Sequence, residues 1–274
     1  MRVALVTGSA QGIGLAIVKG LLVKGFKVFG VDVKDQNAQV DGYGKEFYTP
    51  LKFDLSDAEQ CRKLVEEIGC VDVLVNNAAI LIENELDNVT DDQFDEIVST
   101  NLRAPFVLSV AASKGMKERK WGRIVNMSSV GARTGGISQS CVYAATKAGL
   151  IAVTKNFARN LGPYGITTNA VAPGAIATPM AVEQSLSDES LLKRVVEATP
   201  VGRLGTADEA AATVVFLASE EASFVNGVCL DVNGGWVMAC LRTMAPRMIQ
   251  IFLLFLQRKK VLCKPLMSLH VLII

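Results

Sequence analysis

Short, nearly continuous hydrophobic runs alternate along this chain with longer segments whose apolar positions follow a helical repeat. Seven of the short runs are rich in Val and Ile and apolar on both faces, which is typical of parallel strands covered by helices. The pattern predicts strands at Val3–Thr7, Lys27–Val31, Pro50–Phe53, Val71–Val75, Arg123–Met127, Ile166–Val171 and Val228–Val232. It predicts helices near residues 12–24, 57–68, 91–118, 142–161 and 207–219.

This alternation predicts an α/β fold, a doubly wound (Rossmann) seven-stranded parallel sheet with the strand order 3-2-1-4-5-6-7. Residues 1–238 contain no Pro/Gly-rich linker, so we expect them to form a single domain. Ser56 is the expected N-cap of the helix at 57–68, and Thr90 has the same place before the helix at 91–118.

Composition and charge narrow the class of protein. Half of the 274 residues are hydrophobic and a fifth are charged, which excludes a disordered chain, a collagen-like fibre and a coiled coil. The formal net charge of +1 gives no overall case for nucleic-acid binding. Six cysteines without a C-x-x-C pair and a single histidine, His270, make a zinc or other metal site unexpected.

The end of the chain differs from the rest. Residues 241–274 hold six of the 28 basic residues and no acidic one, so 22 basic and 27 acidic residues remain in the first 240. We therefore treat 239–274 as an atypical basic and apolar extension, with apolar runs too short to span a membrane. Three interpretations of this segment remain open: an extension without a role in function, an anchor that contacts a membrane surface, or an arm that packs on the protein or on another subunit. The first strand begins at Val3 without a preceding signal-peptide pattern, so we expect a reducing, cytoplasmic location.

Three glycines follow the first strand, in the run Thr7-Gly8-Ser9-Ala10-Gln11-Gly12-Ile13-Gly14. Gly8 permits a tight turn, Gly12 lets a pyrophosphate approach the backbone, and Gly14 lets the helix pack on the strand. The helix that begins here points its free N–H groups at an anion. The sequence therefore predicts a dinucleotide site at this turn.

Asp32 ends the second strand, where a carboxylate can accept hydrogen bonds from ribose hydroxyls and repel a 2′-phosphate. The glycine turn carries Gln11 and no basic residue. These features favour NAD over NADP, although the nearby Lys34 keeps NADP open.

Tyr143 and Lys147 are four residues apart and share one face of a predicted helix. A lysine ammonium there would lower the pKa of the phenol, a pairing suited to protonating a carbonyl oxygen or deprotonating an alcohol. Ser129 and Asn77 follow strands that end at the same edge of the sheet, and Asn101 is an amide that needs a partner inside a helix.

In this order and spacing the motifs resemble the short-chain dehydrogenase/reductase (SDR) family over residues 1 to about 238. They are Thr7-Gly-x-x-x-Gly12-x-Gly14, Asp54, Asn76-Asn77-Ala78-Ala79, Asn101, Ser129, Tyr143-x-x-x-Lys147 and Pro173-Gly174 followed by Thr178.

The resemblance implies a role for each matching residue. Tyr143 would be the general acid/base, Lys147 would bind the nicotinamide ribose and lower the tyrosine pKa, Ser129 would bind the substrate oxygen, and Asn101 would hold a relay water. The cofactor-binding set would be Gly8, Gln11, Gly12, Ile13, Gly14, Asp32, Asp54, Leu55, Asn77, Ala78, Tyr143, Lys147, Pro173, Gly174, Ile176 and Thr178.

The spacing between serine and tyrosine is one residue longer than is common in the family, so Ser128, Ser138 and Ser140 remain lesser alternatives to Ser129. Residues 179–203 correspond to a substrate lid, in which Met180, Ala181, Val182 and Leu186 would form an apolar wall. Arg133 and Arg194 are candidates for contact with an acidic substrate.

These residues predict an NAD(P)-dependent oxidoreductase that transfers a hydride between a nicotinamide cofactor and a secondary alcohol or ketone. An NADP-linked 3-oxoacyl-thioester reductase and a non-catalytic cofactor-binding regulator are the alternatives. The resemblance also implies a homotetramer or dimer, with residues 207–232 in the interface.

Overall fold

The computed structural model describes residues 1–36, 40, 42, 44, 46–136, 141–181 and 189–238. Within these residues seven strands form one sheet in the order β3-β2-β1-β4-β5-β6-β7, and every neighbouring pair is parallel. The predicted doubly wound sheet and its strand order are therefore confirmed. The strands are β1 (Val3–Thr7), β2 (Lys27–Asp32), β3 (Tyr48–Lys52), β4 (Val73–Asn76), β5 (Gly122–Met127), β6 (Ile166–Pro173) and β7 (Cys229–Val232).

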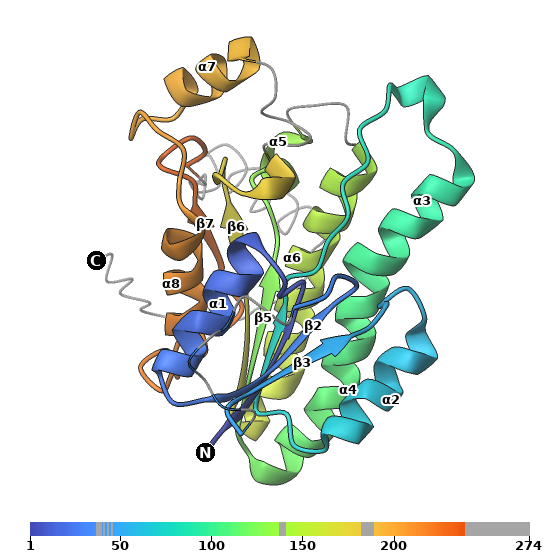
Figure 1. Cartoon of the computed structure of the whole chain (residues 1–274), viewed down its shortest axis with the longest axis vertical. Helices are drawn as coiled ribbons and strands as arrows, with labels where there is room; N and C mark the ends of the chain where they lie inside the picture. Colours follow the sequence, from blue (N-terminus) through green and yellow to red (C-terminus); the bar gives the residue numbers. More distant parts are fainter. Residues whose placement is uncertain are drawn as a thin grey trace, which may run out of the picture. The chain divides into compact units, whose positions relative to one another are not determined.

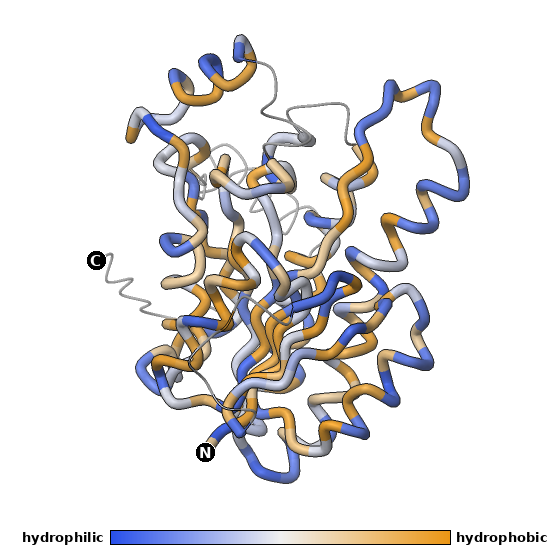
Figure 2. The backbone as a smooth tube through the Cα atoms, in the orientation of Figure 1, coloured by the Kyte–Doolittle hydropathy of each residue, from blue (hydrophilic) through white to orange (hydrophobic). Residues whose placement is uncertain are grey.

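Helices cover both faces of the sheet (Figure 1). One face carries α1 (Gly12–Val23) and α8 (Ala207–Leu217), and the other carries α2 (Ala58–Ile68), α4 (Ala104–Arg119) and α6 (Cys141–Leu161). Consecutive strand residues point to opposite faces, so Val6 packs under α1 and α8 while Leu5 packs under α2 and α4. Figure 2 shows the resulting hydrophobic strands at the centre and mixed polarity along the helices.

The parallel register brings the carboxyl ends of the strands to one edge of the sheet. Asn76 of β4 lies opposite Asn126 of β5, and Met127 lies opposite Val171 of β6. Residues that follow β1, β4, β5 and β6 therefore meet at this edge, although they are far apart in the sequence.

The single helix predicted at 91–118 is interrupted. The structure has α3 (Asp91–Val98), a π-helical stretch (Ser99–Arg103) and then α4. Pro105 lies in the first turn of α4 and lacks the N–H that would donate to the Asn101 carbonyl in a regular α-helix. This missing donor explains why the helix widens at Asn101.

Of the two predicted N-caps, one is confirmed and one is wrong. Thr90 caps α3 in a capping box with Gln93. The N-cap of α2 is Asp57 rather than Ser56, because the Asp57 carboxylate accepts from the N–H groups of Glu59 and Gln60. A carboxylate at this position also interacts favourably with the helix dipole.

Several short elements were not predicted from the sequence. They are α5 (Gly131–Thr134), α7 (Glu189–Ala198) and the 3₁₀ turns Leu86–Asn88 and Gly162–Tyr164. In the part of the chain that the structure describes, no helix is long and apolar enough to cross a membrane.

Candidate active site

The turn between β1 and α1 is tied to the end of β4. The Thr7 hydroxyl accepts hydrogen bonds of 3.0 Å from the backbone N–H groups of Asn77 and Ala78. The Asn77 amide donates to the carbonyl oxygens of Thr7 and Gly8, at 2.9 and 3.0 Å. Gly8 has φ +67°, and a Cβ on it would lie 2.7 Å from the Ala78 Cα. The close approach of the two segments therefore requires glycine at this position.

The other two glycines of the turn have equally specific positions. A Cβ on Gly14 would overlap the Gly8 carbonyl oxygen, so α1 can pack closely on the turn only with glycine there. Gly12 has φ +56°, and a Cβ on it would touch the Thr178 side chain at 3.4 Å. Gln11 makes no side-chain cap on α1, which leaves the first N–H groups of this helix available to an anion.

Asp32 lies at the end of β2 beside the glycine turn. One carboxylate oxygen accepts from the Ala10 N–H at 3.0 Å, and the other accepts from the Lys34 N–H at 2.9 Å. The Lys34 ammonium donates to the Gln11 side-chain oxygen at 3.2 Å. The Asp32 carboxylate and the Lys34 ammonium therefore each bond to a residue of the glycine turn.

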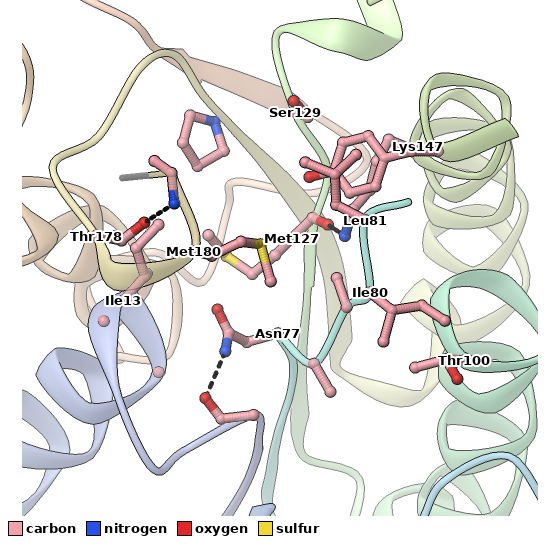
Figure 3. Close-up of a pocket in the computed structure, with 18 of the residues that line it drawn as sticks. Ile13, Asn77, Ile80, Leu81, Thr100, Met127, Ser129, Lys147, Thr178 and Met180 are labelled. Carbon is pink, nitrogen blue, oxygen red and sulfur yellow. Dashed lines mark hydrogen bonds between the residues drawn. The ribbon is translucent and has the colours of Figure 1, made fainter. Parts of the chain in front are cut away.

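A cavity of about 660 Å³ opens above the carboxyl edge of the sheet. Figure 3 shows that its walls come from the glycine turn, the ends of β4, β5 and β6, and α6. Every predicted site residue except Asn101 lines it, namely Gly8, Gln11, Gly12, Ile13, Gly14, Asp32, Asp54, Leu55, Asn77, Ala78, Ser129, Tyr143, Lys147, Pro173, Gly174, Ile176 and Thr178.

Ser129, Tyr143 and Lys147 meet on one wall of the cavity. The Tyr143 hydroxyl forms a hydrogen bond with the Ser129 side chain. The Lys147 ammonium nitrogen lies 5.4 Å from the centroid of the Tyr143 ring and donates to the Met127 carbonyl oxygen at 2.7 Å. The arrangement puts two hydroxyls and an ammonium group beside one space, as a proton-transfer site requires.

The expected lowering of the tyrosine pKa is wrong for this structure. Burial raises the pKa of Tyr143 above its ordinary value, although the hydrogen bond from Ser129 acts in the opposite direction. Burial also lowers the pKa of Lys147 from 10.5 to about 7, so the lysine is not a full positive charge at neutral pH. Both shifts have the same cause, the low polarity of the surroundings.

Ser128 has a structural partner. Its hydroxyl donates to the Lys147 carbonyl oxygen at 2.9 Å inside the protein. Both serines line the cavity, but the Ser129 side chain is the one hydrogen-bonded to Tyr143, and it accepts from the Gly131 N–H at 3.1 Å. The lesser alternatives Ser138 and Ser140 lie outside the described residues.

Asn101 is fully buried, and its amide bonds mainly to Ile80, with a further, longer bond of 3.5 Å to the Thr146 hydroxyl. Its side-chain oxygen accepts from the Ile80 N–H at 2.9 Å, and its side-chain nitrogen donates to the Ile80 carbonyl at 2.8 Å. The amide therefore has the partner that the sequence indicated it needs, and it fixes the segment after β4.

Beyond Ser129 and Tyr143 most of the cavity wall is apolar, although Glu96 and Thr100 also line it. Of the predicted wall, Met180 and Ala181 line the cavity, whereas Val182 and Leu186 lie outside the described residues. Figure 3 shows Met180 opposite Met127, with Ile80 and Leu81 on the neighbouring segment. The sequence did not indicate four further apolar residues of this lining, which are Ile80, Leu81, Leu191 and Val195. Leu191 and Val195 are four residues apart, but this spacing belongs to a helix that the pattern did not predict.

The two arginines considered for an acidic substrate do not line the cavity. The Arg133 guanidinium is paired with the Asp231 carboxylate at 3.4 Å. Arg194 is exposed on α7, the helix whose Leu191 and Val195 reach the cavity. Neither side chain is placed as the substrate contact that we considered.

A parallel sheet with an uncapped helix N-terminus and a serine, tyrosine and lysine on one cavity wall defines a class, the dinucleotide-dependent oxidoreductases. A family model described as enoyl-(acyl carrier protein) reductase matches residues 8–237. The chain belongs to the short-chain dehydrogenase/reductase family. It is an oxidoreductase of hydroxyl and keto groups that uses a nicotinamide cofactor.

Relatives in this family have several named activities. The chain is 40% identical over 242 residues to 3-oxoacyl-(acyl-carrier-protein) reductase FabG of Salmonella typhimurium, a match that covers 86% of this chain and 98% of the relative. It is 39% identical over 238 residues to acetoacetyl-CoA reductase of Shinella zoogloeoides, covering 85% and 98%. A crystal structure of a putative NAD(P)-dependent gluconate 5-dehydrogenase from Beutenbergia cavernae, with bound NADP, has a TM-score of 0.81 and 33% identity, covering 86% and 96%.

Proposed function

We propose that this enzyme oxidises a secondary alcohol, or reduces the matching ketone, with Tyr143 as general acid/base. The observation that carries this proposal is the meeting of Ser129, Tyr143 and Lys147 on one wall of the cavity beside the glycine turn. The bound nicotinamide supplies or accepts the hydride. A screen of ketones and alcohols with each cofactor, read by nicotinamide absorbance, tests the proposal, and it fails if no cofactor turns over with any of them.

In the direction of reduction, Tyr143 gives its phenolic proton to the carbonyl oxygen while hydride reaches the carbonyl carbon. In oxidation the alcohol proton returns to the Tyr143 oxygen. The Ser129 hydroxyl donates a hydrogen bond to the same substrate oxygen and orients it. Lys147, when protonated, stabilises the phenolate that remains after proton transfer. Asn101 positions Ile80 in the wall, and the relay water expected at Asn101 stays a prediction.

We propose NAD as the preferred cofactor, because the Asp32 carboxylate lies where a 2′-phosphate would bring a second negative charge. Lys34 is the cation nearest to Asp32 in the sequence, and its ammonium group donates a hydrogen bond to the Gln11 side chain. NADP is bound in the structure from Beutenbergia cavernae, which makes the alternative worth measuring. The ratio of kcat/KM for NADH and NADPH with one ketone decides between them.

We propose that the substrate has an apolar group next to the reacting carbon. Met180, Leu81 and Leu191 are among the side chains that this group would contact. A carboxylate buried against such side chains loses its hydration without gaining a partner. The similarity to 3-oxoacyl and acetoacetyl reductases supports a 3-oxoacyl thioester, with NADP as the alternative cofactor, as the second candidate.

Matched substrates separate these possibilities. We expect ethyl acetoacetate to exceed acetoacetate in kcat/KM by roughly ten-fold or more, because the two differ mainly in the buried carboxylate. The N-acetylcysteamine thioester of acetoacetate tests the thioester alternative directly. A preference for acetoacetate, or for a sugar acid, contradicts the proposal of an apolar group.

We propose a homotetramer or dimer whose interface includes residues 207–232. Phe216 on α8 is 43% exposed, and Phe224, in the turn before β7, is fully exposed. Exposed aromatic side chains on neighbouring elements are typical of protein interfaces. Light scattering of a Phe216→Ser/Phe224→Ser double variant should give a smaller particle than the wild type, whereas Phe94→Ser on α3 serves as the control.

We infer a cytoplasmic location for this protein and treat residues 239–274, which lie outside the described residues, as a separate extension. The basic charge of this segment supports contact with an anionic membrane surface as one possibility among the three named above. Cell fractionation of the full chain and of a chain that ends at Met238 tests it. Membrane-bound full chain with soluble short chain supports the anchor, and identical distributions contradict it.

A further inference from the structure

A buried polar cluster lies behind the cofactor end of the cavity and takes no part in the chemistry described above. Its centre is Gln36, in the segment after β2, whose side chain is only 4% exposed. The Gln36 side-chain oxygen accepts from the Ser9 hydroxyl at 2.7 Å and from the Tyr48 hydroxyl at 2.8 Å. Its side-chain nitrogen donates to the carbonyl oxygens of Gly30 and Leu51, at 3.2 and 3.1 Å.

These four hydrogen bonds join three separate parts of the fold. Ser9 belongs to the glycine turn, Gly30 to β2, and Tyr48 and Leu51 to β3. An amide can donate twice and accept twice, so Gln36 uses its full capacity in this one cluster. Burial raises the pKa of Tyr48 to about 12, which keeps its hydroxyl a donor at any working pH.

The cluster fills the space beside Gly30. A Cβ on Gly30 would lie 2.7 Å from the Tyr48 hydroxyl, 2.8 Å from the Ser9 hydroxyl and 3.0 Å from the Gln36 oxygen. Gly30 therefore provides the space that the three side chains fill. A cluster this tight and fully satisfied fixes the relative position of the elements that it joins.

The two hydrogen bonds of Asp32 come from residues close in the sequence to members of this cluster. One comes from Ala10, the neighbour of Ser9, and the other comes from Lys34, two residues before Gln36. We propose that Gln36 is a positioning residue for the cofactor: by joining Ser9 to the segment after β2, it holds the Asp32 carboxylate at the orientation that binds the adenosine ribose. This inference rests on the proposed dinucleotide site and adds a residue that does not itself line the cavity.

Two single variants separate positioning from stability. Ser9→Ala and Tyr48→Phe each remove one hydroxyl donor to the same Gln36 oxygen, and neither Ser9 nor Tyr48 lines the cavity. The Tyr48 hydroxyl also interacts with Ser9, but Tyr48→Phe leaves the bond between Ser9 and Gln36 in place. We expect both variants to melt at a lower temperature, and only Ser9→Ala to weaken cofactor binding.

The expected effect of Ser9→Ala is a rise of roughly three- to ten-fold in the Kd for NADH and in the KM, the scale of one lost hydrogen bond, with kcat at saturating cofactor unchanged. ADP-ribose, which carries the adenosine ribose but no nicotinamide, should lose affinity by the same factor. Gln36→Met, of similar size, removes all four bonds and should raise the Kd further.

The outcomes are distinguishable from failure of the function itself. If the wild type binds neither NADH nor NADPH, the proposed function is wrong and this inference goes with it. If the wild type binds cofactor, but Ser9→Ala and Tyr48→Phe change the Kd equally or not at all, Gln36 is structural only and the inference is overturned. Should Gln36→Met fail to fold, the comparison of the two hydroxyl variants still decides.

Discussion

The Lys147 ammonium group donates a hydrogen bond of 2.7 Å to the Met127 carbonyl oxygen, and the same nitrogen lies 5.4 Å from the centre of the Tyr143 ring. The lysine side chain is 2% exposed, and this burial lowers its pKa to about 7 while the pKa of Tyr143 rises. Near neutral pH the phenol therefore keeps its proton. This protonation state fits the proton donor that we propose for ketone reduction.

Replacement of Tyr143 by Phe tests the proton donor directly. We expect Tyr143→Phe to lower kcat by about 10²- to 10⁴-fold, the usual contribution of a general acid, with the Kd for NADH nearly unchanged. If turnover stops while a fluorescence titration shows normal NADH binding, the result also excludes a regulator that works without catalysis. Tyr164→Phe is the control, because Tyr164 is an exposed tyrosine outside the cavity lining. A Tyr143→Phe enzyme with normal kcat would contradict the mechanism.

The pKa of Lys147 predicts how stability depends on pH. The folded value of about 7 lies below the unfolded value near 10.5, so between these limits the unfolded chain binds a proton that the folded protein does not. The free energy of unfolding should therefore rise with pH over this range, by at most about 1.4 kcal/mol per pH unit. The thiols of Cys61, which is buried, and Cys229, which is half-buried, have pKa values raised by burial from 9.0 to about 11, and they act in the opposite direction above pH 9.

Urea unfolding at pH 7.0, 7.75 and 8.5 measures this slope below the range of the thiols. The Lys147→Met variant should lack the part of the pH dependence of the unfolding free energy that comes from titration of Lys147. Lys155→Met, an exposed lysine on the same helix, should keep it. Equal slopes in both variants would show that Lys147 stays charged in the folded protein.

The strands could be predicted from the sequence because burial on both faces leaves a continuous apolar pattern, as in Leu74 and Val75 of β4. The helix boundaries were less well predicted. The pattern at 91–118 is helical throughout, and the change to a π-helical stretch depends on one missing N–H, that of Pro105. At α2, both Ser56 and Asp57 are good capping residues, and only the local backbone geometry selects Asp57.

The site was predicted unevenly for a related reason. Residues that we propose to carry the chemistry, such as Tyr143 and Lys147, are recognisable by type and spacing. Residues that act through contacts distant in the sequence are not. Gln36 follows a strand as an ordinary polar loop residue, and its partners Ser9 and Tyr48 lie 27 and 12 residues away. No pattern in the sequence joins these three.

We expect the cofactor preference to depend on Asp32, and a matched carboxylate three residues further along, Asp35, provides the control. Asp32→Asn removes the charge that opposes a 2′-phosphate, so the ratio of kcat/KM for NADH over NADPH should fall by roughly ten-fold or more. Asp35→Asn removes a carboxylate that is exposed and lies 3.6 Å from the Lys52 ammonium, and it should leave the ratio unchanged. Equal changes in both variants would indicate a general effect of charge rather than contact with the ribose.

A comparison of alanine substitutions at Gly8 and Gly25 separates the free-energy cost of backbone conformation from the cost of steric crowding. Gly8 and Gly25 have φ +67° and +79°, so alanine at either position costs about 1 kcal/mol through the backbone alone. A Cβ on Gly25 meets nothing within 4 Å, whereas a Cβ on Gly8 would lie 2.7 Å from the Ala78 Cα and 2.8 Å from the Asn77 amide nitrogen.

Gly25→Ala should therefore lower the melting temperature by roughly 2–4 °C and leave NADH binding intact. Gly8→Ala should lower it further and also abolish NADH binding, because the turn must move away from β4. Calorimetry and NADH titration of the two variants measure both effects, and equal melting temperatures would show that the turn relaxes without strain.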